Sequence, residues 1–146
     1  MFDHYKSFDL RVANLHGEDV MTVIYPRDNA GHILNSKYEI VKSVVYSSNF
    51  NYSNMHDFNV VDGGDRALVL TKNIGYEVSR EMSEVVGFDG NCSVRADGLK
   101  ELDITGPDAK TIFAWNGTDH IGLDETTFNR GSIEDMCNKN WDIQYA

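Results

Sequence analysis

The sequence has only two cysteines, two prolines and no apolar run long enough to cross a membrane. Cys92 and Cys137 lie far apart without a CxxC pair, so neither a disulfide framework nor a cysteine zinc site is indicated. The N-terminal stretch carries acidic residues early and lacks the apolar core of a signal peptide, so we expect no secretion by that route. What remains is an ordinary globular composition, 41% hydrophobic over 146 residues, which predicts one domain covering residues 1–146.

Basic residues are also scarce, and the charge is uneven along the chain. Residues 1–73 carry nine acids and seven bases, whereas residues 74–146 carry fourteen acids and six bases, within a net charge of −10. Such a surface repels phosphate backbones and anionic lipids, which argues against direct nucleic-acid or membrane binding. A protein partner, for which a basic one fits the charge, is the better inference.

Strand patterns dominate the first half of the chain. Apolar and polar residues alternate in some segments, and β-branched residues gather in others, as is typical of half-buried strands. The predicted strands are FDLRVANL (8–15), DVMTVIY (19–25), KYEIVKSVVY (37–46) and a pair in FNVVDGGDRALVLT (58–71) around a glycine turn. A further hairpin is expected over residues 92–105, with Asp97 and Gly98 in its turn.

The second half contains helical periodicity. Residues 74–86 place apolar side chains on one helical face, with Asn73 as a cap and Gly87 just past the end. Residues 132–141 begin with a capping-box-like Ser132 and predict a terminal helix that docks through Trp141. Residues 107–117 fit a third helix or a strand, and we favour the helix. The expected fold is therefore a single α+β domain, a mostly antiparallel sheet with two helices or three.

The stretch REMSEVVGF, residues 80–88, matches most positions of a known catalytic motif. It resembles the end of the Nudix box, the strand-loop-helix signature of enzymes that hydrolyse nucleoside diphosphates linked to another group. The resemblance implies a helix on which Arg80, Glu81 and Glu84 act, with the two glutamates holding Mg²⁺ against a diphosphate. A hard cation of this kind needs several oxygen ligands. The upstream FNVVDGG is similar to the apolar run and paired glycines that open the box.

The same stretch also departs from the Nudix pattern. Val85 stands where the second glutamate of the pair belongs, and a valine cannot ligate a metal. Lys72 occupies the position of the loop glutamate, and the distance from Gly64 to Arg80 exceeds that of the box. The alternative is a solvated helix face stabilised by ion pairs and ended by a glycine cap. We adopt this second interpretation, which predicts no catalytic residue, no metal and no cofactor.

Two loops are candidates for binding. SSNFNYSNMH, residues 47–56, is a long polar stretch in which rigid aromatic rings stand among small hydrogen-bonding residues, as is common at protein contacts. Its predicted partner-binding residues, with the aromatic residue that follows, are Phe50, Tyr52, Asn54 and Phe58, although Phe50 and Phe58 would equally serve to anchor the loop to the core. The second loop, formed by Asp62, Gly63, Gly64 and Asp65, is either the turn between two strands or a backbone cradle for a small ligand.

These patterns favour a non-enzymatic, acidic protein-interaction module. The sequence has no nucleophile elbow, phosphate-binding loop or dinucleotide fingerprint. The expected role is a subunit or accessory component of a larger, virion-like assembly of the phage type, or an inhibitor of a basic protein partner. We expect it in the cytoplasm or in such a particle, with a homo-oligomer as a further option. The alternatives are a Nudix-type magnesium hydrolase and a small-ligand-binding protein.

Overall fold

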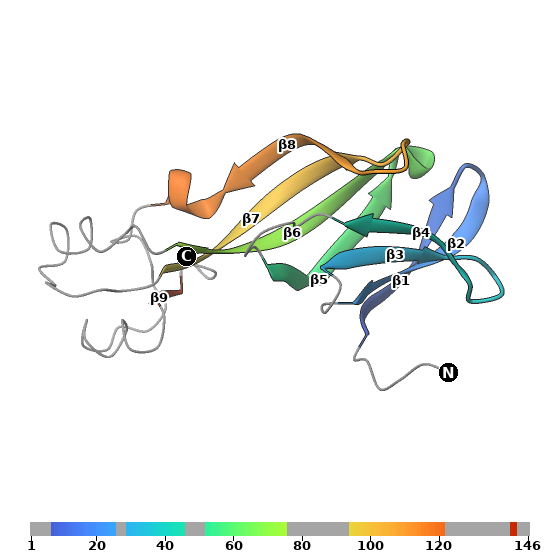
Figure 1. The fold of residues 1–146 in the computed structure, drawn as a ribbon, viewed down its shortest axis with the longest axis horizontal. Coiled ribbons are helices and arrows are strands. Elements are labelled where there is room, and N and C mark those ends of the chain that lie inside the picture. The colour runs from blue at the N-terminus through green and yellow to red at the C-terminus, as the bar shows by residue number, and fades with distance from the viewer. Residues whose placement is uncertain (1–6, 26–28, 46–51, 76–93, 122–140, 143–146) are drawn as a thin grey trace, which may run out of the picture. The chain divides into compact units, whose positions relative to one another are not determined.

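A computed structural model describes residues 7–25, 29–45, 52–75, 94–121 and 141–142. The described residues form strands joined by turns and two short 3-10 segments (Figure 1). The first sheet contains β1 (Phe8–Leu15), β2 (Glu18–Tyr25), β3 (Ala30–Leu34) and β4 (Ile40–Val45). The second contains β5 (Tyr52–Val61), β6 (Arg66–Gly75), β7 (Val94–Asp103) and β8 (Lys110–Asn116), with β9 (Trp141–Asp142) paired to β7. The 3-10 segments are η2 (Asp62–Gly64) and η3 (Gly117–Asp119).

Each sheet follows the order of the chain. The strand orders are β1-β2-β3-β4 and β5-β6-β7-β8, and the pairs of the first sheet are antiparallel. Leu15 pairs with Glu18 across a two-residue turn in which His16 and Gly17 both have positive φ. Such turns match the twist of the strands that they join. The parallel pair of β9 with β7 joins Val94 to Trp141 and Arg95 to Asp142.

Contacts divide the chain into two compact units. The first consists of Met1–Thr71 and Leu99–Ala114, and the second of Lys72–Gly98 and Trp115–Ala146. In the second unit, the start of β7 pairs with β9, and the ring of Trp115 stacks on that of His120 with centroids 5.3 Å apart. The organisation of residues 1–146 as a single domain remains a prediction.

The core of the first unit lies between the two sheets. The first sheet contributes Val20 and Ile24 from β2, Ile33 from β3 and Val44 from β4, and the second contributes Phe58, Ala67, Val69, Leu102 and Ile104. Full burial of each large apolar side chain stabilises the fold by about 1.5 to 3 kcal/mol. Gly31 allows the closest approach, because a Cβ atom at this position would lie 2.5 Å from the ring of Phe58.

The predicted α+β class is wrong: the fold is mostly antiparallel β-sheet, and the described residues contain no helix of seven or more residues. Ile74 and Gly75, where a helix over 74–86 was expected to start, belong to β6, and residues 76–86 lie outside the described residues. Burial alternates along β6, with Ala67, Val69 and Thr71 inside, which is the period-two pattern of a strand and not the helical period expected to follow it.

The other two predicted helices are corrected in the same direction. Residues 110–116 form β8, because Thr111, Ile112, Phe113 and Trp115 are β-branched or aromatic and pair well beside β7. Trp141, expected to end a helix over 132–141, lies in β9, and residues 132–140 lie outside the described residues. The hairpin expected over 92–105 is also wrong, since β7 runs unbroken through Asp97 and Gly98 between β6 and β8.

Candidate contact surfaces

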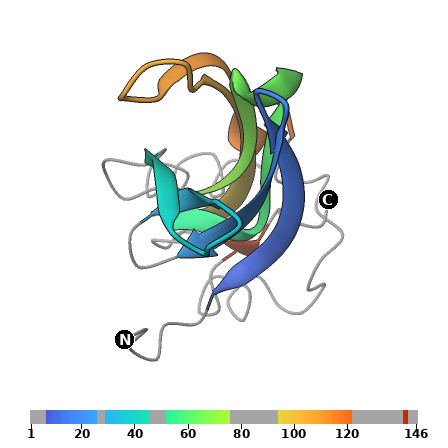
Figure 2. The same ribbon diagram turned by 90° about the vertical axis from the view of Figure 1, so that its right-hand side faces the viewer.

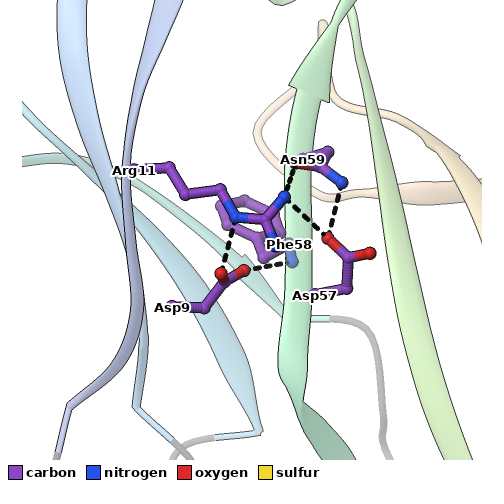
Figure 3. Close-up of polar contacts among 5 residues, drawn as sticks. All are labelled: Asp9, Arg11, Asp57, Phe58 and Asn59. Carbon is purple, nitrogen blue, oxygen red and sulfur yellow. Dashed lines mark hydrogen bonds and ion pairs between the residues drawn. The ribbon is translucent and has the colours of Figure 1, made fainter.

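A polar cluster joins β1 to β5, which contact each other in the first unit (Figure 2). The Asp9 carboxylate accepts hydrogen bonds from Arg11 Nε at 2.5 Å and from the backbone N–H of Phe58 at 2.9 Å (Figure 3). The Arg11 guanidinium lies 3.1 Å from Asp57 and also donates to the Asn59 amide oxygen. Asp9 reaches this position through an irregular pairing between Phe8 and Arg11 and a positive φ of 54°.

Within the polar cluster between β1 and β5, Arg11 and Asp9 bind each other through charge and hydrogen bonding. The hydrogen bond from Arg11 to Asp9 and, less strongly, the charge of Asp57 raise the pKa of Arg11. The side chain of Asp9 is only 9% exposed, and its two oxygens are already engaged. Each oxygen of this carboxylate thus accepts one donor that the fold holds in place. The geometry therefore indicates a structural connection between the sheets.

The glycine loop at Asp62–Asp65 docks against the first hairpin. The carbonyl of Gly63 accepts the His16 N–H at 2.6 Å, and the carbonyl of Asp65 accepts the Ile104 N–H at 2.9 Å. Gly64 is buried, and a Cβ atom there would lie 2.7 Å from Leu15 Cδ1. The loop is thus the turn between β5 and β6, the first of the two interpretations that its sequence allowed. Its role as a ligand cradle remains a prediction, although the carbonyls of Asp62, Gly63 and Asp65 accept backbone hydrogen bonds within the chain.

Charged side chains around this loop pair at the surface. Arg66 Nε lies 3.3 Å from Asp62, and Arg66 Nη1 donates to Glu101 at 2.7 Å. The hydrogen bond to Glu101 raises the pKa of Arg66. His16 Nδ1 lies 3.8 Å from Asp65, and both side chains are more than half exposed. Within the described ranges, no three or more His, Cys, Asp or Glu side chains gather as they would around a metal ion.

The remaining predicted site residues divide between the core, a strand and undescribed segments. Phe58 is fully buried, which is the anchoring role that the sequence offered as its alternative to partner contact. Tyr52 and Asn54 lie in β5, so the expected loop over 47–56 is strand from residue 52 onward. Phe50, Arg80, Glu81 and Glu84 lie outside the described residues, and their partner-binding, catalytic and magnesium roles stay predictions.

An apolar row on the first sheet was not anticipated from the sequence. Val12 pairs with Met21, Met21 with Leu34, and Leu34 with Ile40. Directly paired residues share one face of a sheet, and successive residues alternate faces. Because Val20 and Ile33 face the core, this row lies on the outer face of the sheet. We call Val12, Met21, Leu34 and Ile40 the outer row.

The outer row is most exposed at its two ends. Val12 on β1 is 76% exposed and Ile40 on β4 is 48% exposed, whereas Leu34 on β3 is 5% exposed. Further large apolar side chains that are exposed by half or more are Leu10, Val41 and Val45 on the same sheet, Tyr38 in the β3–β4 connection, and Ile112 and Phe113 on β8. An antiparallel sheet that faces water on one side normally alternates apolar and polar residues. Apolar side chains gathered on outer strands are typical of contact surfaces.

No helix within the described part of the chain is long and apolar enough to cross a membrane. In comparisons with known proteins, no family model, no curated protein and no solved structure matches this chain.

Proposed function

We propose that this protein acts by protein contact, as a subunit or accessory component of a larger assembly, with the outer face of its first sheet as a contact surface. The observation that carries the proposal is the exposed β1 end of the outer row, Val12, together with the exposed Leu10 beside it. Leu10 and Val12 are 69% and 76% exposed, and both lie in β1, where the backbone is already ordered by pairing with β2. Rigid apolar side chains lose little conformational entropy when a partner covers them.

The setting of this surface supports a protein partner. The chain has a net charge of −10, which keeps it soluble and disfavours phosphate-bearing partners. The Asp9 and Arg11 groups are already satisfied within the fold, so they offer no reactive pair to a substrate. The proposed location is the cytoplasm or a virion-like particle, where such a subunit would meet its partner.

The test compares complexes recovered from the native source with three tagged forms of the protein. These are the unchanged chain, the double variant Leu10→Lys with Val12→Lys, and Ser36→Lys as a control for added charge at an exposed turn position. We expect the unchanged chain and the control to recover the same partner in fixed ratio, and the double variant to lose it. Circular dichroism and thermal unfolding establish that all three forms are folded.

Two results would contradict the proposal. One is a native protein recovered alone at its monomer mass, and the other is a partner retained in full by the folded double variant.

The carboxylates of residues 74–146 favour a second candidate function, an inhibitor that occupies a basic groove on a partner protein. Salt separates the two: binding through charge falls steeply as ionic strength rises, whereas an apolar assembly contact does not.

A further inference from the structure

β8 is an edge strand, and over residues 110–114 both of its own faces are exposed. It ends the strand order of its sheet, and within the described residues β7 is the strand beside it. In a strand with one covered face every second residue is buried, yet each residue of Lys110–Ala114 is exposed. Ile112 and Phe113 are 51% and 50% exposed and, as neighbours in a strand, point to opposite faces. The outward backbone N–H and C=O groups of an edge strand are open to a further strand.

β4 and β8, which end the strand orders of the two sheets, differ in how their edges are protected. Natural edge strands avoid unwanted pairing through inward-pointing charges, prolines or bulges. On β4, the half-buried Lys42 has this role, because its ammonium donates to the carbonyls of Ile104 and Gly106. β8 contains no proline and no acidic residue, and its single charge, Lys110, stands exposed at its first position. Of these two edge strands, β8 is therefore the better suited to accept a further strand.

The charges around β8 indicate which kind of partner strand would fit its edge. Asp103 ends β7, the exposed Asp108 lies two residues before β8, and Lys110 begins β8, so the start of this edge carries two acids against one base while its centre is neutral and apolar. A second copy of this chain would bring another charge of −10 to the same place, and the two would repel. An extended segment with alternating apolar residues and a basic end fits both properties.

We propose that β8 binds an extended segment of a partner protein by strand addition, with apolar side chains of the segment against Ile112 and Phe113 and a Lys or Arg end beside Asp108. This inference rests on the proposed function and names the chemistry of one partner contact. The backbone ladder supplies affinity, while the alternate side chains and the basic end supply specificity.

A selection experiment tests the proposal directly. The probe is a displayed library of random peptides about ten residues long, the length of a long strand. We expect selected peptides to alternate apolar residues and to carry Lys or Arg at one end. Replacing those basic residues with Glu, or using Phe113→Lys in place of the unchanged protein, should weaken binding by about tenfold or more. Val41→Lys, an equally exposed position on β4, should leave binding unchanged.

Hydrogen exchange locates the contact. The backbone amides of residues 110–114 should exchange more slowly when a selected peptide is bound. The inference is overturned if no peptide is selected, if selected peptides lack a basic end, if Val41→Lys and Phe113→Lys act alike, or if 110–114 gain no protection. A dimer of this chain that Phe113→Lys abolishes would assign the edge to a second copy and overturn it equally.

Pull-down of the native partner separates this inference from the proposed function. If the partner is lost from the Leu10→Lys and Val12→Lys double variant but kept by Phe113→Lys, the proposed function stands and strand addition at β8 fails. If every variant keeps the partner, both fail. Both stand only if the double variant and Phe113→Lys each lose it.

Discussion

The edge strands of the two sheets in the first unit, β1 and β5 on one side and β4 and β8 on the other, differ in the contacts that they make. On the first, Asp9, Arg11 and Asp57 bridge the strands, and the ring of Phe58 packs against Gly31. On the second, Lys42 donates to carbonyls of the β7–β8 connection, and residues 110–114 of β8 are exposed. Among the described residues, the polar bridge between side chains of the two sheets thus lies on the β1–β5 side, while the buried core joins both sheets.

The largest expected effect compares two phenylalanines, one on each side. Phe58→Ala should lower the free energy of unfolding by about 3 to 5 kcal/mol, because a fully buried ring leaves a cavity. Phe113→Ala, at a half-exposed position, should lower it by under about 1 kcal/mol. Urea denaturation of the two variants measures the difference. Equal losses would show that β8 is as much a part of the core as β5.

Gly31 sharpens the same comparison. Gly31→Ala should cost about 1 to 3 kcal/mol of folding stability, because the new methyl group would meet the ring of Phe58 at 2.5 Å. In a Phe58→Leu background the cost of Gly31→Ala should shrink, since the two positions share one space. A double-mutant cycle from denaturation midpoints checks this. Strictly additive losses would mean that the ring does not limit position 31.

Substitutions of two arginines test how much the polar cluster between β1 and β5 contributes to folding stability. Arg11→Met should lower folding stability by about 1 to 2 kcal/mol, because it removes a donor from the nearly buried Asp9, an effect limited by the 40% exposure of the guanidinium side chain. Arg66→Met removes an arginine paired at the surface and should cost less. Thermal unfolding at matched ionic strength measures both. An equal loss of folding stability in the two variants would show that the contacts of Arg11 between β1 and β5 stabilise the fold no more than a surface ion pair does.

The smallest effect is expected at the start of the β7–β8 connection. The N–H and hydroxyl groups of Thr105 donate to Asp103 and lower its pKa below the ordinary value of 3.8. A lowered folded-state pKa adds stability above the pKa of the unfolded chain, and this is lost as pH falls through the folded-state pKa. Asp103→Asn should therefore be less stable than the unchanged chain at neutral pH. The gap should narrow in denaturation below about pH 4.

Strands with strong local patterns could be predicted from the sequence, whereas those fixed by distant contacts could not. Residues 8–15 and 19–25 alternate or are β-branched, and they form β1 and most of β2. The turn at Asp62–Asp65 was also predicted from its paired glycines. β3 gives little signal, because its Gly31 disfavours a strand locally and is needed only where Phe58 packs on it. The pairing of β7 with two neighbours likewise outweighs the turn preference of Asp97 and Gly98.

The contact surfaces were less predictable than the strands. Val12 and Val20 have the same side chain, yet the first is 76% exposed and the second 5% exposed. Only the register across β1 and β2 assigns them to opposite faces, and the sequence does not contain that register. The bond from Asp9 to Phe58 joins residues far apart in the chain and follows from the sheets coming together.

The packing of Phe58 on Gly31 also constrains how this sequence can change over evolutionary time. As long as an aromatic ring occupies position 58, a side chain at position 31 has to displace it, so substitutions of Gly31 are more readily accepted after position 58 has become smaller. We therefore expect that, in diverged relatives, a residue larger than glycine in the third strand accompanies a smaller residue in the fifth.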